Sequence, residues 1–198
     1  MRIAVSGTHC CGKSTLIDEF LISHPDFAHE PEPYIALEQD YGEVFAAEPS
    51  LDDFYRQLEF NVDRLCRYRS GERVIYERSP VDFLAYMLAL KDLHRDAEST
   101  RFVERSLGIV TDAIQLLDLI VYLPLDDHKD AGIAMPDSED PVLRRAVNSR
   151  LAGIFCDDDF NLFAAHRPMV LEIRGSTPER LRTLEVFLGR QLADGEAR

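Results

Sequence analysis

The sequence has few cysteines and no long hydrophobic run, and both absences exclude classes of protein. Its 4 cysteines lack the spacing of a disulfide framework, so we expect a reduced, cytoplasmic protein. No apolar stretch approaches the roughly 20 residues that a membrane-spanning helix needs. The start of the chain, Met1 to Gly7, becomes polar too early for a signal peptide. We therefore expect no membrane partner.

Positive charge is also scarce. The chain has 22 Lys and Arg residues against 36 Asp and Glu residues, which gives a formal net charge of -14. Such a surface repels the phosphate backbone of nucleic acid, so nucleic acid is not an expected partner. A local basic pocket for a small phosphate compound is still compatible with this charge. The length of 198 residues and the 45% hydrophobic content predict a single domain over residues 1–198.

Short apolar runs alternate with longer helical patterns along the chain. Strands are expected at 2–6, 27–30, 73–77, 119–123 and 169–173, and helices at 13–23, 51–69, 81–90, 100–117, 141–155 and from 177 onward. Continuous apolar runs are typical of strands covered on both faces. The pattern predicts an α/β three-layer fold, with a five-stranded parallel sheet and helices on both faces. The polar stretch 126–140 is predicted to be a lid segment.

The first glycine-rich turn carries the strongest motif. Residues Gly7-Thr8-His9-Cys10-Cys11-Gly12-Lys13-Ser14-Thr15 satisfy G-x-x-x-x-G-K-[ST], with a predicted strand before the motif and a predicted helix after it. Backbone N–H groups of such a loop and the helix N-terminus bind phosphate oxygens. Lys13 then reaches the outer phosphates, and the hydroxyl of Ser14 is a ligand for Mg²⁺. The motif predicts a P-loop NTPase fold and a site for MgATP.

Two cysteines and a histidine inside this loop raise a second reading, which is a metal site. Adjacent cysteines such as Cys10 and Cys11 are poor ligands for one tetrahedral ion, and no second cysteine pair follows them. We therefore interpret His9, Cys10 and Cys11 as variable residues of a phosphate-binding loop.

Carboxylates follow two of the predicted strands, at the edge where ligands bind to open parallel sheets. Glu77 and Arg78 come after the third strand, where the carboxylate would hold Mg²⁺ and the arginine would bind phosphate. The alternative is a helix start with surface charges. Glu30 comes after the second strand, where it would take the proton of an acceptor hydroxyl. The alternative there is a solvated glutamate in a loop stiffened by Pro31 and Pro33.

Together these residues resemble the P-loop deoxynucleoside kinases. The resemblance rests on the phosphate loop, Glu30-Pro31, Gln57 and Arg64 on the next helix, and the segment from Val74 to Ser79. It implies that Glu30 is the base, that Gln57 and Arg64 bind the acceptor, and that Glu77 and Arg78 serve the phosphate site. The segment from Glu77 to Tyr86 is also similar to thymidylate kinases and to compact AAA-type domains that include nicotinamide riboside kinases.

The predicted lid departs from this family because it contains no arginine. Family members usually clamp the transferred phosphoryl group with lid arginines, and here Arg144 and Arg145 on the following helix are the expected substitutes. The sequence therefore predicts an ATP-dependent kinase for a small nucleoside-like acceptor, with ATP and Mg²⁺ as cofactors. The alternatives are a regulatory P-loop ATPase that acts on a protein partner, and a binding module without turnover. The oligomeric state stays open, with a homodimer as one option.

Overall fold

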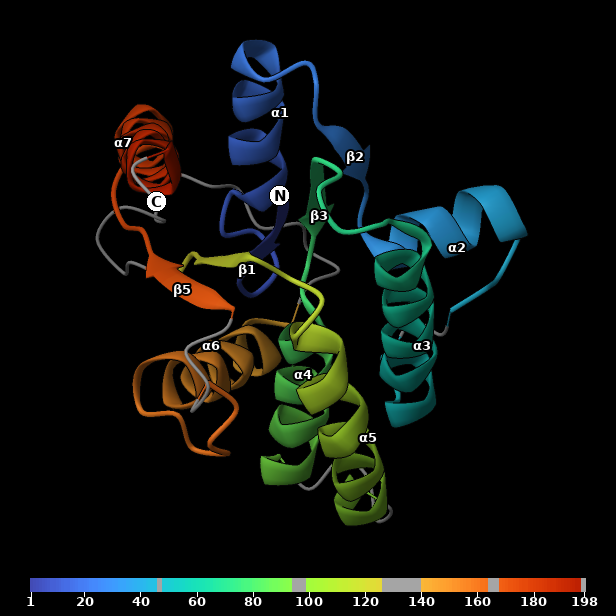
Figure 1. Cartoon of the computed structure of the whole chain (residues 1–198). Coiled ribbons are helices and arrows are strands. Elements are labelled where there is room, and N and C mark those ends of the chain that lie inside the picture. Colours follow the sequence, from blue (N-terminus) through green and yellow to red (C-terminus); the bar gives the residue numbers. More distant parts are fainter. Residues whose placement is uncertain (46–47, 94–98, 126–139, 164–167, 197–198) are drawn as a thin grey trace.

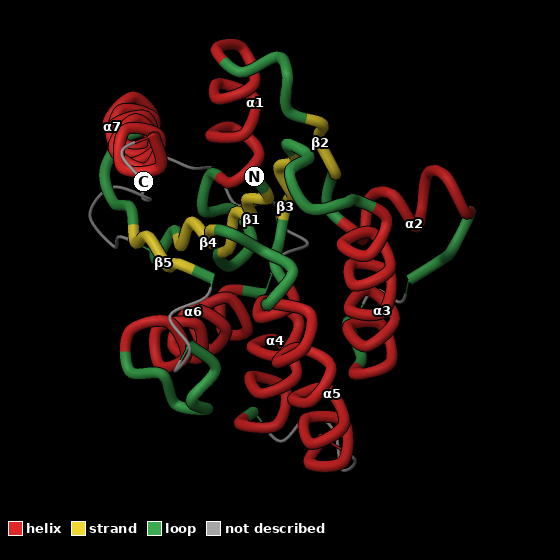
Figure 2. The backbone as a smooth tube through the Cα atoms, viewed as in Figure 1, coloured by secondary structure: helices red, strands yellow, loops and turns green. Residues whose placement is uncertain are grey.

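The protein is an α/β molecule built on one parallel sheet. The structure, a computed structural model, describes residues 1–45, 48–93, 99–125, 140–163 and 168–196. The strands are β1 (Arg2–Ser6), β2 (Ala28–Glu30), β3 (Val74–Glu77), β4 (Leu119–Tyr122) and β5 (Met169–Glu172), in the spatial order β2-β3-β1-β4-β5 (Figure 1, with β4 labelled in Figure 2). All neighbouring pairs are parallel.

Helices cover both faces of this sheet (Figure 2). One face carries α1 (Lys13–Ser23) and α7 (Thr177–Glu196), and the other carries α3 (Leu51–Arg67), α4 (Pro80–Asp92), α5 (Ser99–Ile114) and α6 (Pro141–Cys156). Successive side chains of a strand point to opposite faces. Ile3 and Val5 accordingly belong to the core under α1 and α7, whereas Ala4 belongs to the core under α3 to α6. The predicted fold class is confirmed.

One helix was not predicted from the sequence. The helix α2 (Pro33–Tyr41) begins directly after the Glu-Pro-Glu-Pro stretch and packs against α3. Pro33 occupies its first turn, where a missing N–H and a fixed φ are favourable. Gly42 ends it with a φ of 68°, and its N–H donates to the carbonyl of Glu38. The stretch therefore leads into a helix, which places residues 32 to 35 beside the phosphate loop.

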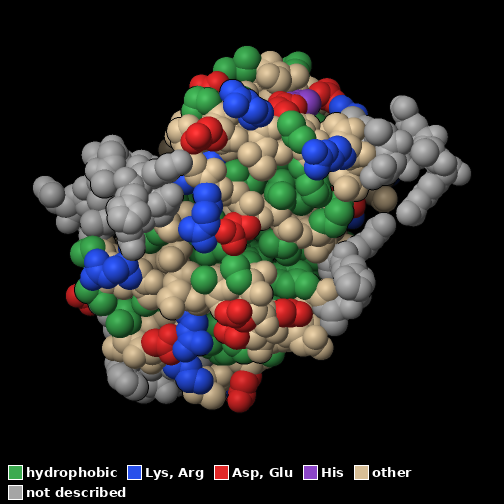
Figure 3. Space-filling model, turned by 90° about the vertical axis from the view of Figure 1, so that its left-hand side faces the viewer, with side chains coloured by type: hydrophobic (Ala, Val, Ile, Leu, Met, Phe, Trp, Pro, Cys, Tyr) green, Lys and Arg blue, Asp and Glu red, His purple; other side chains and the backbone are tan. Residues whose placement is uncertain are grey.

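The predicted lid falls almost entirely outside the described residues, because residues 126–139 are not among them. Asp140 is described, and its side chain accepts hydrogen bonds from the N–H groups of Val142 and Leu143 at the start of α6. Among the described residues, no helix is both long enough and apolar enough to span a membrane. On the face shown in Figure 3, acidic and basic side chains lie interspersed with hydrophobic ones.

Candidate functional site

A cavity of about 1330 Å³ opens at the edge of the sheet where the strands end. This is the edge at which open α/β sheets bind their ligands. Pockets for a single small ligand usually measure about 300–1,000 Å³, so this volume accommodates two molecules side by side. Residues of the phosphate loop and the start of α1, the end of β3, the helices α2, α3, α4 and α6, and the segments next to them line it: His9, Cys10, Gly12, Lys13, Ser14, Glu32, Tyr34, Ile35, Phe45, Glu48, Pro49, Asp53, Phe54, Gln57, Glu77, Arg78, Phe83, Tyr86, Asp140 and Leu143.

Glycine is required at the start of the phosphate loop. Gly7 has a φ of 154°, and a Cβ atom there would lie 2.6 Å from Sγ of Cys11 and 2.7 Å from the carbonyl oxygen of Leu123. Gly12, with a φ of 89°, is the N-cap of α1. The loop is thus a tight turn that ends at a helix N-terminus, which is a geometry that binds anions.

A cationic side chain donates a hydrogen bond to every backbone carbonyl oxygen of this loop from residue 7 to residue 11. The donor and acceptor pairs are Arg78 and Gly7 at 3.1 Å, Lys13 and Thr8 at 2.9 Å, Arg144 and His9 at 3.0 Å, Arg144 and Cys10 at 2.8 Å, and Arg180 and Cys11 at 2.6 Å. We call these four side chains the carbonyl collar. Carbonyl oxygens carry partial negative charge, and hydrogen bonds to cations neutralise it. The collar therefore concentrates positive potential around the loop of an otherwise acidic protein.

Two members of the collar, Arg144 and Arg180, come from the C-terminal part of the chain. Arg144 was expected to clamp phosphate from the lid side, but its guanidinium holds the loop carbonyls and does not line the cavity. Arg145, the second expected clamp residue, is exposed on α6. Arg180 on α7 is 3% exposed and was not anticipated, because nothing in its local sequence marks it.

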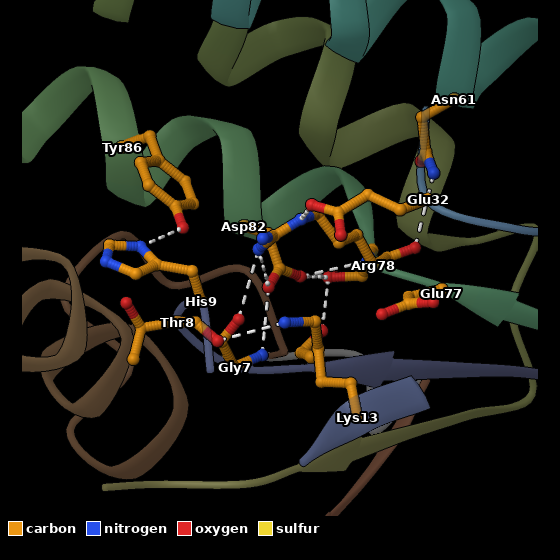
Figure 4. Close-up of polar contacts among 12 residues, drawn as sticks. Gly7, Thr8, His9, Lys13, Glu32, Asn61, Glu77, Arg78, Asp82 and Tyr86 are labelled. Carbon is orange, nitrogen blue, oxygen red and sulfur yellow. Dashed lines mark hydrogen bonds and ion pairs between the residues drawn. The ribbon is translucent and has the colours of Figure 1, made fainter. Parts of the chain in front are cut away.

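Arg78 adopts a backbone conformation that is costly for a side chain of its size. Its φ is 77°, in the left-handed region, where a non-glycine residue stores strain of about 1–3 kcal/mol. Two backbone hydrogen bonds hold it there: its N–H donates to Val5 O at 3.0 Å, and its carbonyl accepts from Nδ2 of Asn61 at 3.2 Å. This conformation turns the guanidinium toward the phosphate loop (Figure 4).

Glu32 is a carboxylate of the cavity lining that lies next to Lys13 and Arg78. It accepts a hydrogen bond from Nε of Arg78, and it lines the cavity. Burial raises the pKa of Glu32, but the charges of Arg78 and Lys13 outweigh burial, so the pKa ends below its usual value. Glu32 is therefore an ionised carboxylate at neutral pH. Reasoning from the sequence had passed over it in favour of Glu30.

Glu30 has other partners. Its Oε1 accepts a hydrogen bond from the Tyr68 hydroxyl at 2.7 Å, and its Oε2 accepts one from Nε of Arg64. Arg64 also donates to the carbonyl oxygen of Pro31 at 2.7 Å. Neither Glu30 nor Arg64 lines the cavity, whereas Gln57, the other predicted acceptor contact, does.

Asp82 joins the phosphate loop to the start of α4. Its Oδ1 accepts from the N–H of Gly7 at 2.9 Å, and its Oδ2 accepts from the N–H of Ser79 at 2.9 Å (Figure 4). The side chain is fully buried, and Arg78 NH1 lies 3.6 Å from its Oδ1. Asp82 therefore fixes the loop and the arginine relative to each other.

Ser14 and Glu77 come together as the sequence analysis expected for a magnesium site. The hydroxyl of Ser14 donates to Oε1 of Glu77 at 2.7 Å, and both residues line the cavity. Mg²⁺ typically binds through one or two protein oxygens, with substrate phosphates and water as its other ligands. The hydroxyl of Ser14 and the carboxylate of Glu77 are oxygen ligands of the kind that Mg²⁺ prefers. Among the described residues, no group of three or more His, Cys, Asp or Glu side chains could hold a metal on its own.

Aromatic side chains also line the cavity. The rings of Phe54 and Tyr86 stack with centroids 4.5 Å apart, and Nδ1 of His9 lies 3.0 Å from the Tyr86 hydroxyl. Burial, with the charges of Arg78, Lys13 and Arg144, lowers the pKa of His9 to about 3. His9 is therefore neutral at physiological pH and adds no cation to the cavity.

Comparisons with known proteins support this fold. No protein-family model matches the chain, and no curated protein matches it in sequence. Solved structures do match. Deoxyadenosine kinase from M. mycoides, solved with bound dATP, has a TM-score of 0.70 at 15% identity over 96% of this chain and 100% of that chain. Thymidylate kinase from Candida albicans has a TM-score of 0.65 at 13% identity over 96% of this chain and 91% of that chain.

A third match covers only part of a longer protein. The NadR protein in complex with NR has a TM-score of 0.61 at 18% identity, over 88% of this chain and 44% of that chain. These neighbours are P-loop kinases, and the chain shares their fold. At such identities the similarity concerns the fold, so what the chain acts on must be argued from its own cavity.

Proposed function

We propose that this protein is an ATP-dependent phosphotransferase that moves the γ-phosphate of MgATP to a hydroxyl of a small nucleoside-like acceptor. The observation that carries the proposal is the position of Glu32. It lines the cavity with Lys13 of the phosphate loop and the aromatic side chains, and it accepts a hydrogen bond from Arg78. A kinase needs a carboxylate near the outer phosphates of ATP, because the acceptor hydroxyl loses its proton as its oxygen attacks the γ-phosphate.

The reaction is an in-line transfer. The acceptor oxygen forms a bond to the γ-phosphorus while the bond from that phosphorus to the bridging oxygen of ADP breaks, and the bonding electrons leave with ADP. The proton of the acceptor hydroxyl passes to Glu32. We assign this role to Glu32 instead of Glu30, because both oxygens of Glu30 are held by Arg64 and Tyr68 outside the cavity lining.

Cationic side chains stabilise the transferred group. Lys13 lines the cavity at the end of the phosphate loop, where the β- and γ-phosphates of ATP would lie. Arg78 holds the carboxylate of Glu32 and presents positive charge to the same region. Ser14 and Glu77 would hold Mg²⁺, which supplies charge neutralisation on the phosphates when it is bound.

One observation favours the second candidate, a regulatory P-loop ATPase acting on a protein partner. Arg144 contacts the loop carbonyls and lies outside the cavity lining. An arginine that clamps the transferred phosphoryl group can contribute several orders of magnitude to the rate. A protein without such a clamp could hydrolyse ATP slowly as a switch.

The test is the identity of the phosphorylated product. Purified protein with MgATP is incubated with a panel of nucleosides and ribosides, and the mixtures are analysed by mass spectrometry for a phosphorylated acceptor. The proposal expects one or more phosphorylated acceptors, with ADP formed in equal amount. ATP turnover at the same rate with and without every acceptor, and no phosphorylated product, would favour the ATPase switch.

A further inference from the structure

The helix α3 presents three polar side chains to the site along one buried face. Gln57, Asn61 and Arg64 are spaced at i, i+4 and i+7, so they lie on one side of the helix. All three are at most 5% exposed. Gln57 lines the cavity. The other two contact backbone carbonyl oxygens on either side of the ion pair between Glu32 and Arg78.

Asn61 holds the arginine of this ion pair. Its Nδ2 donates to the carbonyl oxygen of Arg78 at 3.2 Å, and the backbone of Arg78 has a φ of 77° there (Figure 4). A left-handed backbone persists at a residue other than glycine only when surrounding contacts hold it. From this backbone the guanidinium donates to Glu32 and to the carbonyl oxygen of Gly7 at 3.1 Å. A turn of the backbone toward negative φ would move the guanidinium away from both acceptors.

Arg64 holds the segment that carries the carboxylate of the pair. Its guanidinium donates to the carbonyl oxygen of Pro31 at 2.7 Å, one residue before Glu32. Glu32 and Arg78 are 46 residues apart in the sequence, yet neighbouring turns of one helix contact the backbone at both places. The face of α3 therefore sets how the carboxylate and the guanidinium meet.

Stability alone does not account for an asparagine at position 61. The side chain is buried, and among the described residues its Oδ1 has no hydrogen-bond partner. A buried acceptor without a partner destabilises a fold. Leucine has a similar size and would remove this unpaired oxygen, but it would offer no donor to Arg78. Asn61 thus combines an unfavourable buried acceptor with a donor that holds the arginine.

We propose that Asn61 is a positioning residue for phosphoryl transfer, which fixes the backbone of Arg78 so that the guanidinium meets the carboxylate of Glu32. The proposal rests on the proposed function, in which Glu32 takes the proton of the acceptor. Asn61 does not line the cavity, so it acts through Arg78 and not by contact with a substrate. A misplacement of about 1 Å near the reacting atoms can lower a rate about 10²-fold.

The pKa of Glu32 tests the proposal without any turnover. Burial raises this pKa, and the charges of Arg78 and Lys13 hold it below its usual value. When Asn61→Leu releases the backbone of Arg78, we expect the pKa of Glu32 to rise, because burial then acts against a weaker positive charge. Lys13 stays in place, and His9 is neutral. NMR titration of protein labelled at its glutamate carboxyl groups measures the pKa, and Glu32→Gln assigns the signal.

Asp63→Leu is the matched control, because Asp63 is exposed on the same helix and lies outside the cavity lining. It should leave the pKa of Glu32 at the wild-type value. Far-UV circular dichroism checks that both variants are folded, and Asn61→Ala replaces Asn61→Leu if the leucine variant does not fold. Equal pKa values of Glu32 in the wild type and the Asn61 variant overturn the proposal.

Kinetic measurements connect this geometry to the reaction. With an acceptor that the wild type phosphorylates, Asn61→Leu should lower kcat about 10²-fold and change the KM for ATP by less than about threefold. The loss should shrink in the Glu32→Gln background, because the base that Arg78 positions is then absent. A loss of equal size in both backgrounds would contradict a role through Glu32. If the wild type phosphorylates no acceptor, the proposed function fails, and the pKa comparison still decides whether Asn61 holds the ion pair.

Discussion

Arg64 donates a hydrogen bond from its NH1 to the carbonyl oxygen of Pro31 at 2.7 Å, one residue before Glu32. The same guanidinium pairs with Glu30 through Nε. Arg64 is 3% exposed and comes from α3, so a buried side chain of one helix fixes the turn between β2 and α2. This turn carries Glu32 to the cavity. Two glutamates separated by one proline thus have different surroundings, since Glu30 is held by Arg64 and Tyr68 and Glu32 lines the cavity.

Replacing Glu32 should affect chemistry more than folding. Glu32→Gln removes the proton acceptor at nearly constant size, and we expect kcat to fall by about 10²- to 10⁴-fold, with little change in the KM for ATP. Glu30→Gln should leave kcat within about tenfold of wild type and lower the stability, because it weakens a partly buried ion pair. Steady-state kinetics and urea unfolding of both variants give the comparison. A larger kcat loss in Glu30→Gln than in Glu32→Gln would show that Glu30, and not Glu32, is the catalytic base.

Loss of Arg180 should weaken nucleotide binding. Arg180→Gln removes a charge-assisted hydrogen bond of 2.6 Å to the carbonyl of Cys11, and we expect the Kd for MgATP to rise about tenfold. Arg182→Gln is the matched control, because Arg182 is exposed on the same helix. Titration calorimetry measures both variants, and far-UV circular dichroism checks that they are folded. Equal Kd values for MgATP in the two variants would show that Arg180 does not support nucleotide binding.

Two glycine substitutions should have opposite effects on stability. Gly7→Ala places a Cβ against Cys11 and the carbonyl of Leu123 at a positive φ, so we expect a loss of about 3 kcal/mol in the free energy of unfolding. Gly108→Ala lies in α5 with open space around the new methyl group, and a helical Gly→Ala exchange should stabilise the protein by about 0.5–1 kcal/mol. Thermal and urea unfolding report both changes. A neutral Gly7→Ala would show that the loop is not tightly packed.

Acid should destabilise the protein through His9. Burial and neighbouring cations hold the pKa of folded His9 at about 3, whereas an unfolded histidine titrates near 6.5. Below about pH 6.5 the unfolded state therefore binds a proton that the folded state refuses, so stability falls as the pH falls toward 3. Between pH 6.5 and 5 the wild type should lose about 2 kcal/mol more than His9→Gln.

The control for this pH effect is His29→Gln, at an exposed position of β2. Its stability should follow the wild-type pH profile in urea unfolding at several pH values. Parallel profiles for the wild type and His9→Gln would show that His9 accepts a proton in the folded state.

Divalent cation removal should stop turnover. Excess EDTA is expected to abolish phosphoryl transfer, and added Mg²⁺ should restore it. Glu77→Gln weakens one of the two oxygen donors at the site, so the Mg²⁺ concentration for half-maximal rate should rise about tenfold. Glu72→Gln, on the exposed turn before β3, is the comparison variant and should keep the wild-type requirement. Turnover that persists in EDTA would exclude a magnesium role for Ser14 and Glu77.

The local parts of this fold were predictable from the sequence. The phosphate loop, α1 and the buried strands follow from hydrophobic runs, glycine spacing and helix caps, all of which act within a few residues. The helix α2 was missed, because Pro31 and Pro33 suggest a loop, yet Pro33 also suits the first turn of a helix. That one helix decides which glutamate reaches the cavity. Sequence alone could not separate Glu30 from Glu32, since both precede a proline.

Contacts between residues far apart in the sequence could not be predicted from local sequence patterns. Arg180 and Cys11 are 169 residues apart, and their hydrogen bond depends on how α7 packs beside α1. Arg144 was identified as a phosphate-site residue from its place after the predicted lid. Whether its guanidinium contacts phosphate or the loop backbone is a matter of tertiary geometry, and the structure places it on the carbonyls of His9 and Cys10.

The carbonyl collar also bears on how the protein matures during synthesis. The phosphate loop leaves the ribosome before α6 and α7, because Arg144 and Arg180, which complete its collar, lie 135 and 169 residues beyond the loop residues that they contact. Nascent chains begin to fold from the N-terminus while translation continues. A ribosome-bound chain that stops before α7 would therefore carry the whole glycine-rich motif without its finished anion site. The collar is completed only after the segment that carries Arg180 has been synthesised and α7 has docked beside α1.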